Sequence, residues 1–132
     1  IKPARVTELW SRHCNDLIAR FVQMFPDRFR GVAGLPQHMN EPLDVRAIPE
    51  LRRCVEQLGF IGCLINPDPT EGEGPVPPGL GDEFWWPLYR EMVRLDAPGL
   101  IHSAGSCQPR ESYTLKFINE ESIAVVSLLG SK

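Results

Sequence analysis

The chain has 132 residues, of which 42% are hydrophobic, and a formal net charge of −3 at pH 7. This length and apolar content allow one globular core. The acidic balance, without a basic run, excludes the charge pattern of a nucleic-acid-binding protein. The longest apolar run, residues 123–129, is broken by Ser127 and is far shorter than the roughly 20 residues of a membrane span. We therefore expect a single domain over residues 1–132, with neither nucleic acid nor membrane as a partner.

The four cysteines form no C-x-x-C pair, and no signal peptide indicates an oxidising compartment. We expect them to be reduced, mostly buried thiols in a cytoplasmic protein. They are Cys14, Cys54, Cys63 and Cys107. The chain begins with Ile1 rather than Met, and it stops within an unfinished helix–loop pattern, so we expect it to be a piece of a longer protein.

The first half of the chain alternates helical and strand-like patterns. Apolar residues recur every three or four positions over residues 6–25, which predicts an amphipathic helix. Its apolar face consists of Trp10, Cys14, Leu17, Phe21 and Met24. Residues 29–38 predict a buried strand, and a second helix follows over residues 48–58, with Pro49 in its first turn and Gly59 at its left-handed end. Residues 60–68 then predict a strand that is covered on both faces.

In the second half, residues 66–82 are rich in proline and glycine, which favours an active-site loop. A third helix is predicted over residues 84–95, with Asp82 as its N-cap. Because Pro87 lies too deep for that start, the helix either begins near Trp86 or kinks there. A strand at 99–103 and a helix at 120–129 complete an alternating α/β order, which predicts parallel strands. Three strands form either a minimal open sheet or part of a (β/α)₈ TIM barrel.

Ligands of parallel α/β proteins bind at the carboxyl ends of the strands. The predicted strands are followed there by Gln37, His38, Asn66, Asp68, His102, Ser103 and Ser106. Among these residues His102 is the candidate metal ligand, because a neutral imidazole suits a zinc site that keeps one position open. The alternative is a core histidine bonded to a backbone carbonyl. His38 is typical of an exposed loop, and His13 of a packing or surface position.

Other polar residues have weaker cases. Asn66 suits a proline-rich turn, and it also suits a donor to a substrate carboxylate or carbonyl. Arg110 and Tyr113 suit either an anionic substrate or ordinary surface solvation. Ser106 and Cys107 are nucleophiles only beside an activating base, so covalent catalysis is disfavoured. The glycines of the loop form no nucleotide-binding motif.

Four segments, in order and spanning nearly the whole chain, resemble one known family. They are "FPDRFRGVAGLPQ", "IPELRRCVEQLGFIGCLINPDP", "FWWPLYREMVRLDAPGLIHSAGSC" and "FINEESIAVV". The sequence resembles the metal-dependent amidohydrolase superfamily, in the branch that holds 2-amino-3-carboxymuconate-6-semialdehyde decarboxylase and 4-oxalomesaconate hydratase. The nearer likeness is to the hydratase, through the strand ends "LINPDP" and "IHSAGSC" and the helix pattern W-x-P-x-Y-x-x-M.

The resemblance implies a partial (β/α)₈ barrel of about three βα units, with one Zn²⁺ at the carboxyl ends of the strands. It implies a cytoplasmic lyase of aromatic catabolism, in protocatechuate degradation. Its substrate is then a carboxylated muconate-type acid, 4-oxalomesaconate, which is hydrated to 4-carboxy-4-hydroxy-2-oxoadipate. By motif, His102 is a metal ligand. From their positions at or after two adjacent strand ends, Asn66, Ser106, Arg110 and Tyr113 are expected to donate hydrogen bonds to the substrate. No residue is assigned as the general base.

The chain departs from the family pattern because it lacks the H-x-H strand and the later metal ligands. One histidine does not hold a catalytic zinc, so the remaining ligands are expected outside this chain, and the isolated chain is expected to be inactive. Its open sheet edges favour association, and a homo-oligomer is expected. Two alternatives stay open: a metal-dependent decarboxylase of the same superfamily, and a non-catalytic α/β fragment.

Overall fold

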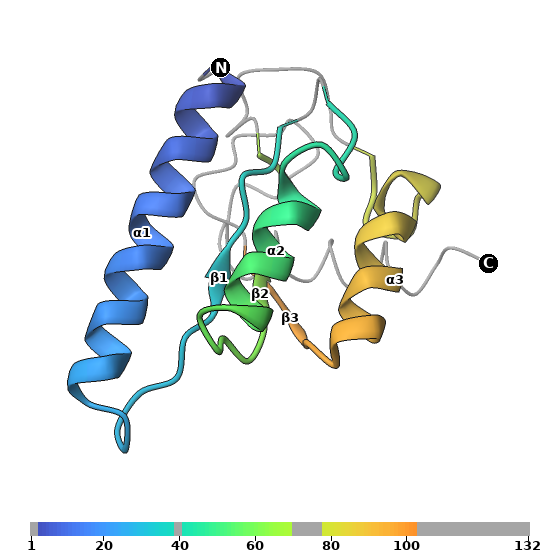
Figure 1. Cartoon of the computed structure of the whole chain (residues 1–132). Helices are drawn as coiled ribbons and strands as arrows, with labels where there is room; N and C mark the ends of the chain where they lie inside the picture. Colours follow the sequence, from blue (N-terminus) through green and yellow to red (C-terminus); the bar gives the residue numbers. More distant parts are fainter. Residues whose placement is uncertain (1–2, 39–40, 70–77, 103–132) are drawn as a thin grey trace, which may run out of the picture.

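The computed structural model describes residues 3–38, 41–69 and 78–102 (Figure 1). Within these ranges the helices are α1 (Ala4–Met24), α2 (Ala47–Glu56) and α3 (Trp86–Leu95), the 3₁₀ turn is η1 (Glu83–Trp85), and the strands are β1 (Ala33–Gly34), β2 (Cys63–Ile65) and β3 (Gly99–Ile101). None of these helices has the length and apolar character needed to cross a membrane. The predicted helix at 120–129 lies outside the described residues.

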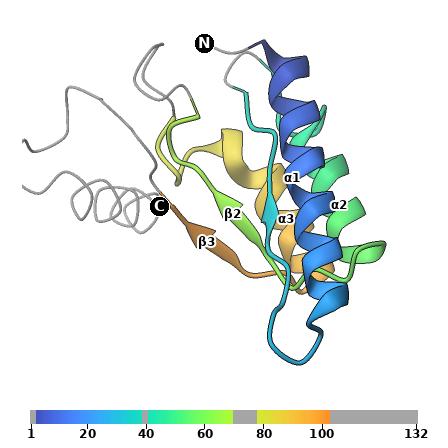
Figure 2. The same cartoon turned by 90° about the vertical axis from the view of Figure 1, so that its left-hand side faces the viewer.

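The three strands form one parallel sheet in the order β1-β2-β3. Ala33 pairs with Cys63 at one end of the register, and Ile65 pairs with Ile101 at the other. The three helices lie on the same side of this sheet (Figure 2). A strand order that follows the chain, with all helices on one face, is the arrangement of a (β/α)₈ barrel, whereas a doubly wound sheet has helices on both faces. The predicted α/β fold is therefore confirmed, and its geometry is that of part of a barrel.

The strands are shorter than the apolar runs predicted. The run at 29–38 yields only two strand residues, and the run at 60–68 yields three. Pro36 has no backbone N–H for a ladder, and the Gln37 N–H donates to the Leu35 carbonyl of its own segment at 2.9 Å, which turns the chain out of β1. Before the strands, Ile61 N–H already donates to the Gly31 carbonyl at 2.9 Å, so the segments run side by side beyond the ladder itself.

Helices α2 and α3 begin and end as the sequence rules require. Pro49 falls in the first turn of α2, and Gly59 follows that helix with a φ of 70°. The conflict between Asp82 and Pro87 is resolved by two successive elements. The Asp82 carboxylate accepts the Phe84 N–H at 2.9 Å and caps η1, while α3 proper begins at Trp86 with Pro87 in its first turn. The alternative of a late helix start is the one observed.

The apolar face predicted for α1 is not the face that packs on the sheet. Trp10 is 68% exposed, and Leu17, Phe21 and Met24 are also exposed. The buried residues of α1 are Asn15 and Ala19. The small Ala19 lets the helix approach the sheet closely, and Asn15 takes part in hydrogen bonds that replace apolar packing.

Asn15 joins α1 to both β1 and α2. Its Nδ2 donates to the Gly34 carbonyl at 3.0 Å and to Glu50 Oε1 at 2.8 Å, and its Oδ1 accepts the Gly34 N–H at 2.9 Å. Because the Ala33 N–H donates to Gly62 of the neighbouring segment, the groups of Gly34 point to the opposite edge of the strand. The Asn15 carboxamide therefore satisfies the outer edge of β1 at this position.

Helices α2 and α3 are joined by an ion-pair network around Glu91. This carboxylate accepts from Arg52 at 2.6 and 3.1 Å and from Arg94 at 2.6 and 2.9 Å. The hydrogen bonds from Arg52 and then from Arg94 lower the pKa of Glu91 to about 2. The apolar core beside this network includes Leu51, Trp85 and Leu88.

We predict that Glu91→Gln lowers the melting temperature near neutral pH. The folded-state pKa lies below the ordinary value, so the stabilisation is complete above about pH 4.5 and is lost as the pH falls towards about 2. The difference in melting temperature between wild type and variant is expected to shrink over this range. Glu56→Gln is the control, because Glu56 is half exposed and has one ion pair, with Arg94. Equal effects of both variants at every pH would contradict the prediction.

We predict that Gly62→Ala destabilises the sheet while Gly34→Ala does not. A Cβ on Gly62 would lie 2.5 Å from the backbone oxygen of Pro98, which also accepts the Cys63 N–H. The backbone must shift, at a cost of about 1–3 kcal/mol. A Cβ on Gly34 meets nothing closer than Asn15 Oδ1 at 3.6 Å, an ordinary contact. Thermal unfolding of both variants checks the prediction, and an unchanged melting temperature for Gly62→Ala would refute it.

Candidate functional site

The carboxyl ends of the three strands bring the predicted polar residues to one edge of the sheet. Ile65 and Ile101 are the last paired residues of β2 and β3, and the His102 N–H continues the ladder by donating to the Ile65 carbonyl at 2.9 Å. The next residues along the two strands are Asn66 and His102. Adjacent strands lie about 4.8 Å apart, so these two residues are direct neighbours across the strand ends.

Alternation along the strands sets the face to which both residues belong. Cys63 and Ile65 are buried beneath the helices, which places Leu64 on the opposite face. Leu100, its partner in β3, is 59% exposed. Asn66 and His102 continue the Leu64 and Leu100 rows, on the face that α1, α2 and α3 leave open (Figure 2). In a barrel this is the inner face, where ligands reach the strand ends.

Gln37 fastens the end of β1 to the end of β2. Its Nε2 donates to the Asn66 carbonyl at 3.0 Å, and its Oε1 accepts the Asn66 N–H at 2.9 Å. The Asn66 side chain in turn accepts the Asp68 N–H through Oδ1 at 3.0 Å, which forms a tight Asx-type turn. Both Gln37 and Asp68 are buried. The strand end is thus a hydrogen-bonded structure that positions Asn66.

His102 is exposed at the end of β3 in this chain. As a test of metal fit, the described residues contain no group of three or more histidine, cysteine, aspartate or glutamate side chains able to hold a metal ion. A catalytic zinc needs three protein ligands, so this part of the chain does not hold one by itself.

The other predicted site residues have varied positions. Ser106, Arg110 and Tyr113 lie outside the described residues, as does the middle of the 66–82 loop. His38 is half-buried and not an exposed loop residue, and His13 is exposed with its ring centroid 6.4 Å from that of Trp10. The structural role of Gln37 did not emerge from the sequence. The signal for it is Pro36, because a proline has no N–H for the strand ladder, and a nearby side chain can then supply the missing hydrogen bonds.

Two buried thiols are unsuited to nucleophilic chemistry. Burial raises the pKa of Cys54 to about 12 and that of Cys63 to about 11. Such thiols stay protonated at neutral pH, and the thiolate is the reactive form. Cys14 is partly buried, and all three of these cysteines are free, whereas Cys107 lies outside the described residues. Within the described ranges, the structure therefore offers no cysteine nucleophile at the strand ends.

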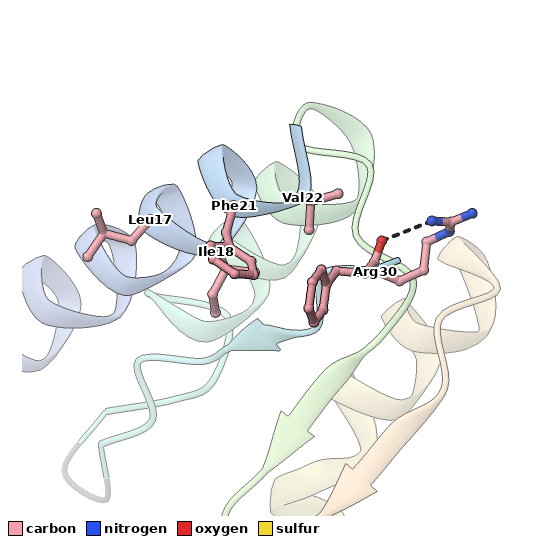
Figure 3. A pocket seen from close by; sticks show the side chains of 6 residues that line it. Leu17, Ile18, Phe21, Val22 and Arg30 are labelled. Carbon is pink, nitrogen blue, oxygen red and sulfur yellow. Dashed lines mark hydrogen bonds between the residues drawn. The ribbon is translucent and has the colours of Figure 1, made fainter. Parts of the chain in front are cut away.

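Two hollows of the described surface lie away from the strand ends. One of about 400 Å³ lies between α1 and the segment that leads into β1, at the opposite end of the sheet from Asn66 and His102 (Figure 3). It is lined by Leu17, Ile18, Phe21, Val22, Phe29 and Arg30. A second, of about 620 Å³, lies between the segment before α2 and the start of α3, and three of its side chains are the carboxylates of Glu41, Asp44 and Glu83.

The amidohydrolase family model matches residues 2–128 of this sequence. The chain belongs to the amidohydrolase family. The resemblance inferred from the strand-end motifs is thereby confirmed, and with it the interpretation of the three-stranded sheet as part of the barrel of that family. In such a barrel Asn66 and His102 stand at the catalytic end.

Similar proteins include both hydratases and decarboxylases. The chain is 47% identical over 121 residues to 2-keto-4-carboxy-3-hexenedioate hydratase of Sphingobium sp., which covers 91% of this chain and 35% of that protein. The crystal structure of 4-oxalomesaconate hydratase from Rhodopseudomonas palustris matches with a TM-score of 0.80 at 35% identity, over 95% of this chain and 35% of that one. Dihydroxybenzoic acid decarboxylase from Polaromonas sp., solved with bound manganese and an inhibitor, matches with a TM-score of 0.81 at 30% identity, over 99% and 41%. The chain thus spans 35–41% of the length of these relatives.

Proposed function

We propose that this chain is part of a metal-dependent hydratase that adds water to a carboxylated, conjugated keto acid of aromatic catabolism, namely 4-oxalomesaconate. The main support for this proposal is the 47% identity to a hydratase of 2-keto-4-carboxy-3-hexenedioate over 91% of the chain. The likeness to the solved 4-oxalomesaconate hydratase supports the same reaction class. The reaction adds one water: its oxygen bonds to the carbon that becomes the 4-hydroxyl carbon, and a proton goes to the neighbouring carbon of the former double bond.

The strand ends supply part of what this reaction needs. In the proposal His102 is one ligand of the metal, taken to be Zn²⁺, and the other ligands come from outside the chain. Asn66 is a donor to a substrate carboxylate or carbonyl from the neighbouring strand end. Ser106, Arg110 and Tyr113, which follow β3 in the chain, are proposed as further donors to the anionic substrate. The proposed enzyme is cytoplasmic and homo-oligomeric.

A decarboxylase is the second candidate, because a decarboxylase of the same fold matches nearly all of the chain. Both reactions act on carboxylated substrates, so the products separate them. Release of carbon dioxide from a carboxymuconate-type or dihydroxybenzoate substrate identifies the decarboxylase. Formation of 4-carboxy-4-hydroxy-2-oxoadipate without carbon dioxide identifies the hydratase.

We predict that the full gene product hydrates 4-oxalomesaconate, that a chelator abolishes the reaction, and that Zn²⁺ restores it. Loss of the conjugated chromophore gives the rate, and mass spectrometry identifies the product. If Mn²⁺ but not Zn²⁺ restores the activity, the proposed metal is wrong, while the proposed reaction is still supported. The 132-residue chain alone is expected to show no turnover, because its described residues lack a complete metal site. Turnover by that chain would contradict the proposal that the other metal ligands lie outside it.

We predict that His102→Ala removes the bound metal and lowers kcat at least about 100-fold, since loss of even an outer partner of a metal ligand typically costs 10–100-fold. Metal content per protomer and kcat are measured together. His13→Ala is the matched control, because His13 is exposed on α1, away from the strand ends. Full metal content in His102→Ala would show that this residue is not a ligand.

A further inference from the structure

The end of the β1–β2 ladder is completed by a side chain. Ala33 N–H donates to the Gly62 carbonyl, and a parallel ladder repeats every two residues. Its next steps would pair the Asn66 N–H with the Leu35 carbonyl, and the Asn66 carbonyl with the Gln37 N–H. Instead the Gln37 N–H turns back to the Leu35 carbonyl at 2.9 Å. The Gln37 carboxamide takes over both bonds to the Asn66 backbone, at 2.9 and 3.0 Å.

This replacement holds the Asn66 side chain in one orientation. Gln37 binds both the N–H and the carbonyl of the Asn66 backbone. The Asn66 Oδ1 accepts the Asp68 N–H at 3.0 Å. Because Oδ1 is the acceptor, the other terminal atom of the side-chain amide, Nδ2, carries the two N–H donors. Among the described residues no hydrogen bond occupies Nδ2 of Asn66, and the residue is half-buried. The Asn66 side chain thus stands at the end of β2, and His102 is the corresponding residue at the end of β3.

A comparison within the same chain shows what is particular to Gln37. Asn15 makes the same two-point pairing, in its case to the N–H and carbonyl of Gly34 on the outer edge of β1. Gly34 has no side chain, so that pairing only fastens α1 to the sheet. Gln37, by contrast, binds the backbone of a residue whose side chain carries a donor at the candidate site, and Gln37 itself is buried, with 5% exposure.

We propose that Gln37 is a positioning residue for substrate: its carboxamide fixes the Asn66 backbone so that Nδ2 of Asn66 donates to a substrate carboxylate beside His102. This inference rests on the proposed function and names a part of the same site. Because a carboxylate keeps its charge throughout the hydration, the hydrogen bond from Asn66 contributes equally to the bound substrate and to the transition state. Its loss raises KM and leaves kcat nearly unchanged.

The test is Gln37→Met in the full gene product, with 4-oxalomesaconate as the probe. Met has a similar length and volume but cannot replace the two hydrogen bonds. KM is expected to rise about tenfold or more, the cost of one lost hydrogen bond to a charged group, with kcat within about twofold of wild type. Asn66→Ala is expected to raise KM to the same extent. The double variant is expected to be no worse than either single one, since Gln37 acts through Asn66.

Two controls separate positioning from stability. Asn15→Leu removes the equivalent carboxamide pairing at Gly34, so it is expected to lower the melting temperature and leave KM unchanged. Gln23→Met makes the same chemical change on the exposed side of α1 and is expected to alter neither quantity. If Gln37→Met does not fold, Gln37→Glu replaces it, since a carboxylate keeps the bond from the Asn66 N–H but opposes the Asn66 carbonyl.

The outcomes are distinct. A Gln37 variant that lowers the melting temperature but keeps the wild-type KM overturns the positioning role and leaves the hydratase proposal intact. KM effects of Gln37 and Asn66 that add in the double variant also overturn it. If the wild type shows no turnover, the hydratase proposal fails, and calorimetric binding of 4-oxalomesaconate becomes the measurement. Weaker binding by Gln37→Met then supports the positioning role, whereas no binding by the wild type overturns both proposals.

Discussion

The parallel pairing of β2 with its two neighbours is the constraint on which the site depends. Because the register matches Ile65 with Ile101, the residues after these strands, Asn66 and His102, meet at one edge and on one face. A shift by one residue would send either side chain towards the helices. The strands contain only two or three residues each, so their alignment draws support from hydrogen bonds outside the ladder.

Buried carboxamides provide much of that support. Asn15 completes the outer edge of β1, and Gln37 completes the junction between β1 and β2. In both cases a side chain offers one donor and one acceptor to backbone groups that pair with no strand among the described residues. A buried unpaired backbone group costs about 1–3 kcal/mol, so these polar side chains stabilise the interior where an apolar residue would not.

Charged groups organise the helical layer outside the sheet. Burial raises the pKa of Glu50, but hydrogen bonds from Arg53 and Asn15 outweigh that effect, and its pKa lies below the ordinary value. Glu50 is thus an ionised carboxylate between α1 and α2, as Glu91 is between α2 and α3. The helical layer is therefore held by paired charges around a small apolar core, and the candidate site lies on the opposite face of the sheet.

The sequence by itself determined the alternation of helices and strands and the family, because these depend on local periodicity and short motifs. At the start of α3 it indicated Asp82 as a cap and a conflict with Pro87, and it left open whether the helix starts late or kinks. It also named Asn66 and His102 as polar residues that follow strands. Only the tertiary structure decided that the apolar stripe with Trp10 and Phe21 faces outwards, that Asn15 is the buried residue of α1, and that Gln37 binds the Asn66 backbone. These contacts join residues 19 to 35 positions apart. Local patterns carry no information about which polar side chain meets which strand edge, because that choice is made by the packing of the sheet and helices together.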